Sequence, residues 1–69
     1  MTLDYQSVEA GKIYRVKASD GMRHVLILKK FENEYGFKNF NFLNLTKNKI
    51  IKNYLATILL SDFKLSRIK

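Results

Sequence analysis

The sequence predicts a mainly β fold, a small five-stranded antiparallel barrel, and three observations support this prediction. Short apolar stretches alternate with polar side chains at the two-residue period of a strand. Clusters of Gly, Asn, Asp, Ser and Thr interrupt these stretches at close spacing, as turns do in all-β proteins. A length of 69 residues without Pro or a linker predicts one domain over residues 1–69, and 46% hydrophobic residues suffice for a core.

The first predicted hairpin joins strands at residues 11–18 and 22–31 through a turn at residues 19–21. With a three-residue loop, Lys17 faces Arg23 and Arg15 faces Val25. With a two-residue loop at residues 20–21 the partners change, but the basic side chains stay near the tip. For the three-residue loop, one face of the hairpin carries Tyr14, Val16, Ala18, Met22, Leu26 and Leu28, with His24 among them.

The middle of the chain predicts a central strand and an aromatic strand. Residues 22–31 are apolar on both faces, which is typical of a strand inside a sheet. Residues 32–36 form the next predicted turn, residues 37–45 the aromatic strand and residues 46–49 a third turn. Phe40 and Phe42 lie two residues apart, so we expect both in the core.

The last third of the chain leaves two interpretations open. Residues 50–60 form either one long bent strand or a strand followed by a short helix that starts at Asn53. Ser61 and Asp62 break this run, and residues 63–68 alternate again as a final strand. A first strand led by Gly11, a hairpin meander and a short last strand resemble SH3-like and Sm-like barrels. The resemblance implies an SH3-like barrel with a short helix or 3-10 turn near residues 53–60.

The charge of the chain points to anionic partners. Thirteen Lys and Arg against six Asp and Glu give a net charge of +7, concentrated in residues 12–30 and 47–69. Tyr35 and Phe37 flank a turn near these blocks in the sequence, where aromatic rings can stack on unpaired bases. The candidate nucleic-acid-binding residues are Arg15, Lys17, Arg23, Tyr35, Phe37, Lys47, Lys49 and Lys52.

Several other classes of protein are disfavoured. His24 is the only imidazole and no nucleophile is marked beside it, so we expect no enzymatic activity, although small basic ribonucleases with barrel folds exist. Without Cys, and with Glu32 and Glu34 as an isolated pair, we expect no metal or cofactor. The first residues lack the pattern of a signal peptide, and the apolar stretch at residues 55–60 is too short to span a membrane. We therefore expect a cytoplasmic protein without membrane contact.

Two hypotheses for function follow. The first is a non-enzymatic module that binds RNA or single-stranded DNA, largely through phosphate contacts. The second rests on composition, which resembles small accessory proteins of phages and mobile elements. That resemblance implies docking on an acidic surface of a host protein, which is inhibited or redirected, through Ile13, Val25 and Ile27 on the outer hairpin face. A homodimer through an edge strand is a related expectation.

Overall fold

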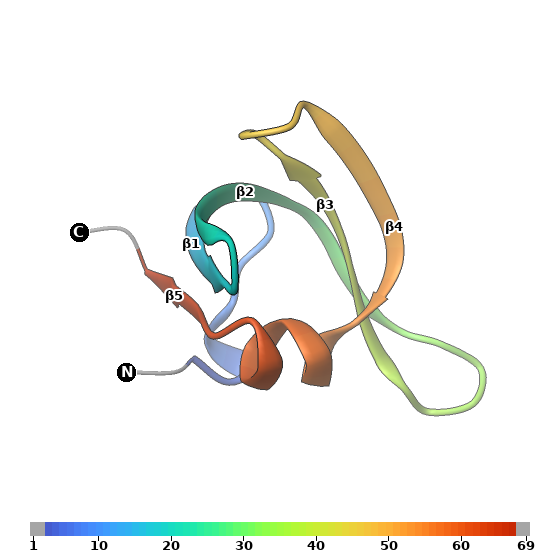
Figure 1. The fold of residues 1–69 in the computed structure, drawn as a ribbon. Coiled ribbons are helices and arrows are strands. Elements are labelled where there is room, and N and C mark those ends of the chain that lie inside the picture. Colours follow the sequence, from blue (N-terminus) through green and yellow to red (C-terminus); the bar gives the residue numbers. More distant parts are fainter. Residues whose placement is uncertain (1–2, 68–69) are drawn as a thin grey trace.

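Five antiparallel strands form a single, strongly bent sheet in the computed structural model, which describes residues 3–67 (Figure 1). The strand order is β4-β3-β2-β1-β5. The strands are β1 (Ile13–Ala18), β2 (Gly21–Glu32), β3 (Lys38–Asn44), β4 (Lys49–Leu55) and β5 (Leu65–Arg67). The predicted mainly β fold with five antiparallel strands is confirmed, whereas the predicted closure into a barrel is not, because in the described residues β4 and β5 remain the two edges of the sheet. Ile68, the end of the last predicted strand, lies outside the described residues.

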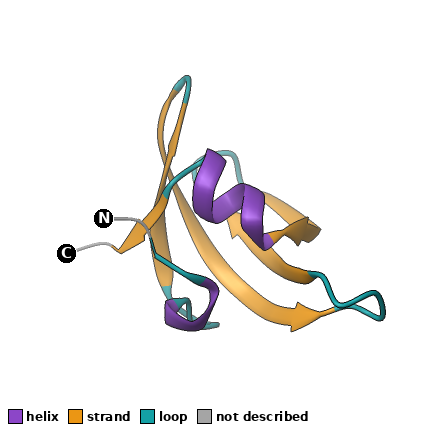
Figure 2. Cartoon of the chain, turned by 90° about the horizontal axis from the view of Figure 1, so that it is seen from below, coloured by secondary structure: helices purple, strands orange, loops and turns teal. Residues whose placement is uncertain are grey.

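Two short helical segments complete the fold (Figure 2). The 3-10 turn η1 (Tyr5–Ser7) is capped by Asp4, whose carboxylate accepts hydrogen bonds from the Ser7 amide at 2.9 Å and hydroxyl at 2.7 Å. The segment η2 (Ile58–Asp62) lies between β4 and β5, the two edges of the sheet, and contacts both strands. Among residues 3–67 no hydrogen-bonded ladder joins these edges, so η2 spans the gap between them.

Of the two interpretations of residues 50–60, the strand followed by a helix is confirmed, with a later boundary. Tyr54 and Leu55 still pair with β3, and the chain becomes helical at Ala56 rather than at Asn53. Asn53 instead has a positive φ of 57° where the pairing of β3 and β4 shifts register. The boundary is displaced because Asn tolerates the left-handed conformation that this bulge requires.

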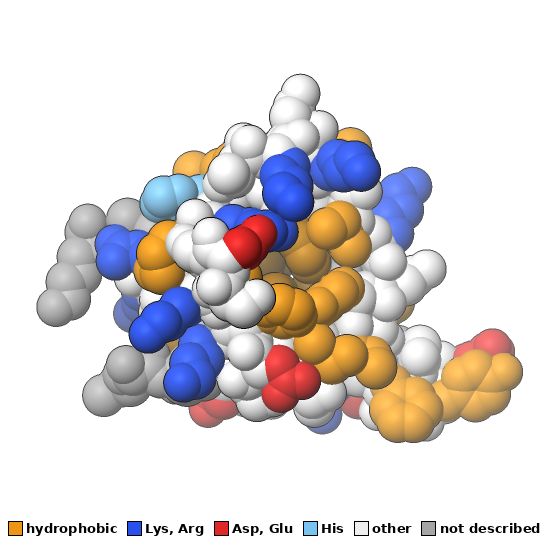
Figure 3. Space-filling model, viewed as in Figure 1, with side chains coloured by type: hydrophobic (Ala, Val, Ile, Leu, Met, Phe, Trp, Pro, Cys, Tyr) orange, Lys and Arg blue, Asp and Glu red, His pale blue; other side chains and the backbone are white. Residues whose placement is uncertain are grey.

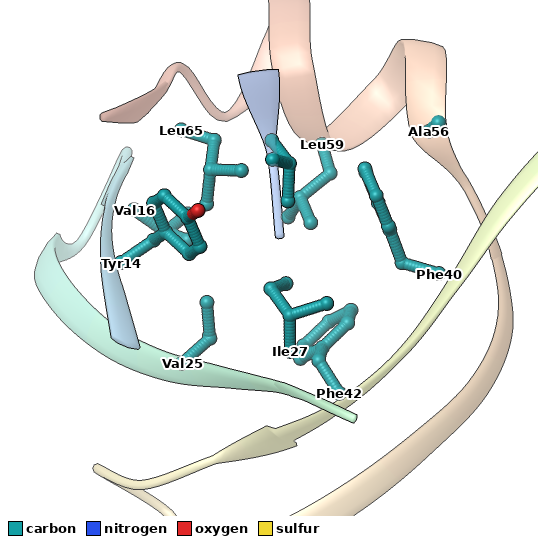
Figure 4. Packing of buried hydrophobic residues seen from close by; sticks show 10 residues of the cluster. Tyr14, Val16, Val25, Ile27, Phe40, Phe42, Ala56, Leu59 and Leu65 are labelled. Atoms are coloured by element: carbon teal, nitrogen blue, oxygen red, sulfur yellow. The ribbon is translucent and has the colours of Figure 1, made fainter. Parts of the chain in front are cut away.

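The core lies on the concave side of the sheet (Figure 4). Phe40 is fully buried and Phe42 almost so, which confirms their predicted place in the core. Leu59 of η2 and Leu65 of β5 belong to the same buried cluster and cover it from the open side of the bend. Tyr5 of η1 stacks on Phe40, with 5.5 Å between the ring centroids, and closes one end. The buried set is Val8, Tyr14, Val16, Val25, Ile27, Phe40, Phe42, Ala56, Leu59 and Leu65.

The register predicted for the first hairpin is wrong. Ala18 pairs with Gly21, so the turn is the two-residue Ser19-Asp20, and neither predicted loop forms. Lys17 pairs with Met22, and Arg23 pairs with Val16. Because the side-chain period of a strand is two, a shift of one residue moves the side chains of β2 to the other face as far as the irregularity in register between Ile27 and Lys29. Val25 and Ile27 therefore enter the core, whereas Met22, His24 and Leu28 are exposed.

Candidate nucleic-acid interface

Two turns lie at the same end of the sheet, the β1–β2 turn (Ser19-Asp20) and the β3–β4 turn (residues 45–48). Hydrogen bonds with His24 hold the β3–β4 turn against β2. The His24 amide donates to the Thr46 hydroxyl at 3.2 Å, and the Leu45 amide donates to the His24 carbonyl at 2.9 Å. The buried side chain of Asn44 accepts a hydrogen bond from the Lys47 amide at 3.1 Å. This contact fixes the start of the β3–β4 turn.

An apolar hollow opens below these turns (Figure 3). Its empty space is about 420 Å³, including open solvent at the mouth. Three aromatic rings contribute to the wall: Phe42 and Tyr54 meet edge to face with 5.5 Å between centroids, and Tyr54 and Phe63 lie 6.3 Å apart. The lining residues are Val16, Ala18, Arg23, Val25, Phe42, Asn44, Ile51, Tyr54, Leu59 and Phe63. We call this space the aromatic hollow.

Basic side chains lie at the rim of the aromatic hollow, at the end of the sheet that carries the two turns. Arg23 lines the hollow and forms an ion pair with Asp20 across the β1–β2 turn. The hydrogen bond from Arg23 is the main reason why the pKa of Asp20 lies below its ordinary value, and Lys47 adds to this lowering. Lys49 pairs with Asn44 and lies two residues before Ile51, on the same face of β4. Arg23, Lys47 and Lys49 thus belong to one rim.

The lining of the hollow also includes a neutral hydrogen-bonding group, the hydroxyl of Tyr54. Burial raises the pKa of the Tyr54 hydroxyl above its ordinary value, and the nearby charge of Asp62 raises it further. The phenol is therefore protonated throughout the neutral range and is able to donate a hydrogen bond. An aromatic ring with a donor hydroxyl, in an apolar hollow that has cationic side chains at its rim, suits a flat heterocycle attached to an anion.

The other predicted basic residues do not join this rim. Arg15 and Lys17 alternate with the core residues Tyr14 and Val16, and so lie on the outer, convex face of the sheet. Lys17 and Arg23 are consequently on opposite faces, in contrast to the predicted pairing. Lys52 is exposed at the bulge of β4.

The predicted stacking residues are exposed but lie far from the rim. Tyr35 is 77% exposed and Phe37 58% exposed, in the turn between β2 and β3. The Asn33 side chain accepts hydrogen bonds from both of their amides, at 3.0 and 2.9 Å, and shapes this turn. From Arg23 the chain runs along β2 to Glu32 before the turn begins, a contour length of about 30 Å. The structure therefore brings three of the predicted basic residues together, but not the two aromatic ones.

The aromatic wall of the hollow was missed by the sequence reasoning. Tyr54 lies in the segment whose structure the sequence left open, Phe42 was assigned to the core alone, and Phe63 was assigned to the final strand, which in the structure begins only at Leu65. The available signal was the alternation of Ile51 with Lys49, which places a basic residue on the core-facing side of β4. The bulge at Asn53 interrupts this alternation before Tyr54, so the pattern cannot be followed further.

Other kinds of site have little support in the part of the chain that the structure describes. Residues 3–67 contain no cluster of three or more His, Asp or Glu side chains able to hold a metal ion. The same residues contain no helix with the length and apolar character needed to cross a membrane. His24 is exposed on the outer face, opposite Arg15 in the β1–β2 ladder.

Comparisons of the chain with models of protein families, with curated protein sequences and with solved structures gave no match.

Proposed function

We propose that this protein is a non-enzymatic module that binds RNA or single-stranded DNA at the aromatic hollow. The observation that carries the proposal is an open apolar hollow, walled by three aromatic rings, whose rim carries Arg23, Lys47 and Lys49. Unpaired bases are recognised by stacking on aromatic side chains, while Arg and Lys hold the backbone phosphates. A net charge of +7 adds general attraction to any polyanion.

The mechanism assigns separate tasks to the rim and to the wall. Arg23, Lys47 and Lys49 neutralise consecutive phosphates, which positions the strand without reading its sequence. One base enters the hollow and packs against Tyr54 and Phe63, whose faces accept any base. Tyr35 and Phe37 remain a predicted second stacking surface for a strand long enough to reach the far turn.

Fluorescence anisotropy with labelled oligo-U and oligo-dT, at several salt concentrations, tests the proposal. The logarithm of the dissociation constant should rise with the logarithm of salt, with a slope of about 0.7 per neutralised phosphate. Because the rim supplies two lysines, the double variant Lys47→Ala/Lys49→Ala should lower this slope by about 1.4. Absence of binding to any oligonucleotide at low salt would contradict the proposal.

A matched double variant separates a site from general attraction. Lys12→Ala/Lys29→Ala removes the same charge from exposed positions outside the rim and should leave the slope nearly unchanged. Phe63→Leu keeps an apolar side chain in the hollow but removes a ring, and should weaken binding at least fivefold, since stacking contributes about 1–3 kcal/mol per base. Equal effects of the two double variants would reduce the interaction to non-specific charge attraction.

The second hypothesis is docking on an acidic protein surface. The positive net charge still supports it, but two of its three predicted contact residues are not available. Val25 and Ile27, which were expected on the outer hairpin face, are buried in the core. Of the three predicted contact residues only Ile13 is exposed. A role as a phage or mobile-element accessory protein stays a prediction.

A further inference from the structure

Four aliphatic side chains form a continuous row across the outer face of the sheet. Ile13 of β1 pairs with Leu26 of β2, Leu26 pairs with Leu43 of β3, and Leu43 pairs with Ile50 of β4. Each of these residues alternates with core residues on its own strand, so all four side chains point away from the core. We call this set the outer apolar row: Ile13, Leu26, Leu43 and Ile50.

The outer apolar row is open to solvent. Ile50 is 62% exposed and Ile13 47% exposed at its two ends, while Leu26 and Leu43 are half-buried by their neighbours. Leu28 and Leu45 extend the apolar surface along β2 and just beyond β3, and both are exposed. Single exposed aliphatic residues are common on protein surfaces. A set in direct cross-strand contact over four strands instead marks a surface that binds another molecule.

The charges around the row select the partner. Arg15 and Lys17 lie on the same face of β1, and Lys52 follows Ile50 by two residues on β4. No acidic residue occupies an outward position on β1, β2, β3 or β4. A partner surface that covers the row will therefore bind more tightly if Asp and Glu surround its apolar centre, because they attract these basic side chains.

We infer that the outer apolar row docks an acidic amphipathic helix of a partner protein. Three strand spacings of about 4.8 Å give the row a length of about 14 Å. A helix of about nine residues has the same length, at a rise of about 1.5 Å per residue. A second copy of the chain is disfavoured, because it would bring Arg15, Lys17 and Lys52 against their own equivalents at a net charge of +7. A nucleic acid is disfavoured because Ile and Leu offer no ring on which a base can stack.

A designed peptide provides the probe. It is a 14-residue helix-forming peptide with Leu and Ile on one face and Glu at the edges of that face, compared with the same peptide carrying Lys in place of Glu. Amide chemical shifts of the labelled protein should move at the outer apolar row with the Glu peptide. Affinity should be at least tenfold lower for the Lys peptide at low salt.

Surface substitutions then locate the contact. Ile50→Thr keeps the β propensity of an exposed strand residue. This change should lower the affinity for the Glu peptide at least fivefold. Leu55→Thr makes the same kind of change to an exposed residue outside the row and should change affinity less than twofold. Circular dichroism and the urea midpoint check that both variants fold like the unmodified protein.

Three results would overturn the inference. One is equal affinity for the Glu and Lys peptides. Another is that the Glu peptide changes amide chemical shifts at the aromatic hollow instead of at the outer apolar row. The third is dimerisation through the row, seen in analytical ultracentrifugation as a concentration-dependent mass that Ile50→Thr abolishes. The inference does not depend on the proposed function, because oligonucleotide binding at the hollow is measured separately and Ile50→Thr should leave it unchanged.

Discussion

At the scale of single residues, the Asp20–Arg23 ion pair controls the rim of the aromatic hollow. Arg23 is the only rim cation whose charge is directly engaged by an acid in the described residues, through the ion pair across the turn. Asp20 and Arg23 lie three residues apart, on either side of Gly21. The pair therefore orients the guanidinium and at the same time competes with any phosphate that approaches it.

Removing the acid should strengthen nucleic-acid binding. Asp20→Asn frees Arg23 and removes one negative charge from the rim, so we expect oligo-U affinity to rise about threefold to tenfold at low salt. Anisotropy titration measures the change. Glu9→Gln is the control, since it removes an exposed acid remote from the hollow. An equal gain for both variants would assign the effect to net charge alone.

At the scale of elements, β2 explains why the sequence predicted the strands better than their faces. Val25 and Ile27 occupy one face and Leu26 and Leu28 the other, so hydrophobicity alone fits either face in the core. The length of the preceding turn decides the register. Ser19-Asp20 forms the turn because Gly21 takes a φ of 126° as the first residue of β2, a role that the sequence cannot distinguish from a place inside the turn.

The same uncertainty affected the candidate site. Arg23, Lys47 and Lys49 were each predicted from the sequence as basic contact residues, but the sequence did not show that they share one rim. Arg15 and Lys17 were placed beside Arg23 because the predicted register of the first hairpin was off by one residue. The distance to Tyr35 was not predictable, because it depends on β2 continuing without a break to Glu32.

The β2–β3 turn should depend on the side chain of Asn33. Its carbonyl oxygen accepts from the amides of Tyr35 and Phe37, so Asn33→Ala leaves both donors without this partner. We expect a loss of about 1–2 kcal/mol in the free energy of unfolding, measured by urea denaturation. Asn33→Asp keeps an acceptor oxygen and should recover most of this loss. Equal destabilisation by Asp and Ala would show that the two hydrogen bonds do not stabilise the turn.

At the scale of the whole molecule, the sequence predicted the number of strands, their antiparallel direction and the hairpins between successive strands, but not the pairing of β5 with β1. Alternating stretches and turn residues are local signals, and each β hairpin joins neighbours in the chain. Two features depended on long-range packing instead. The helical start at Ala56 follows from the bulge at Asn53, and the aromatic hollow forms only where η2 crosses between the sheet edges.

Stability at acidic pH should reflect two carboxylates. Hydrogen bonds from Ser7 lower the pKa of Asp4, and Arg23 lowers that of Asp20, both below the model-peptide value of 3.8. The unfolded chain therefore takes up these protons first. The stability they contribute is complete above about pH 5 and is lost as pH falls through the lower folded values.

Urea midpoints between pH 7 and pH 2 measure this dependence. Asp4→Asn/Asp20→Asn should give a smaller decrease below pH 4 than the unmodified protein, because both groups no longer titrate. Asn at position 4 still caps η1, which limits other effects of the change. An identical pH profile for the two proteins would contradict a native-state role for these carboxylates.

The pairing of β5 with β1 has a consequence for how the protein is made. The ladders from β1 to β4 join neighbouring strands, whereas Val16 of β1 pairs with Leu65 of β5, near the other end of the described chain. Leu65 is fully buried, so the core is incomplete until this residue has left the ribosome. During synthesis the meander of four strands emerges first, with the concave side uncovered. We therefore expect the pairing of β1 with β5 to form last, because closing this long loop carries the largest entropic cost.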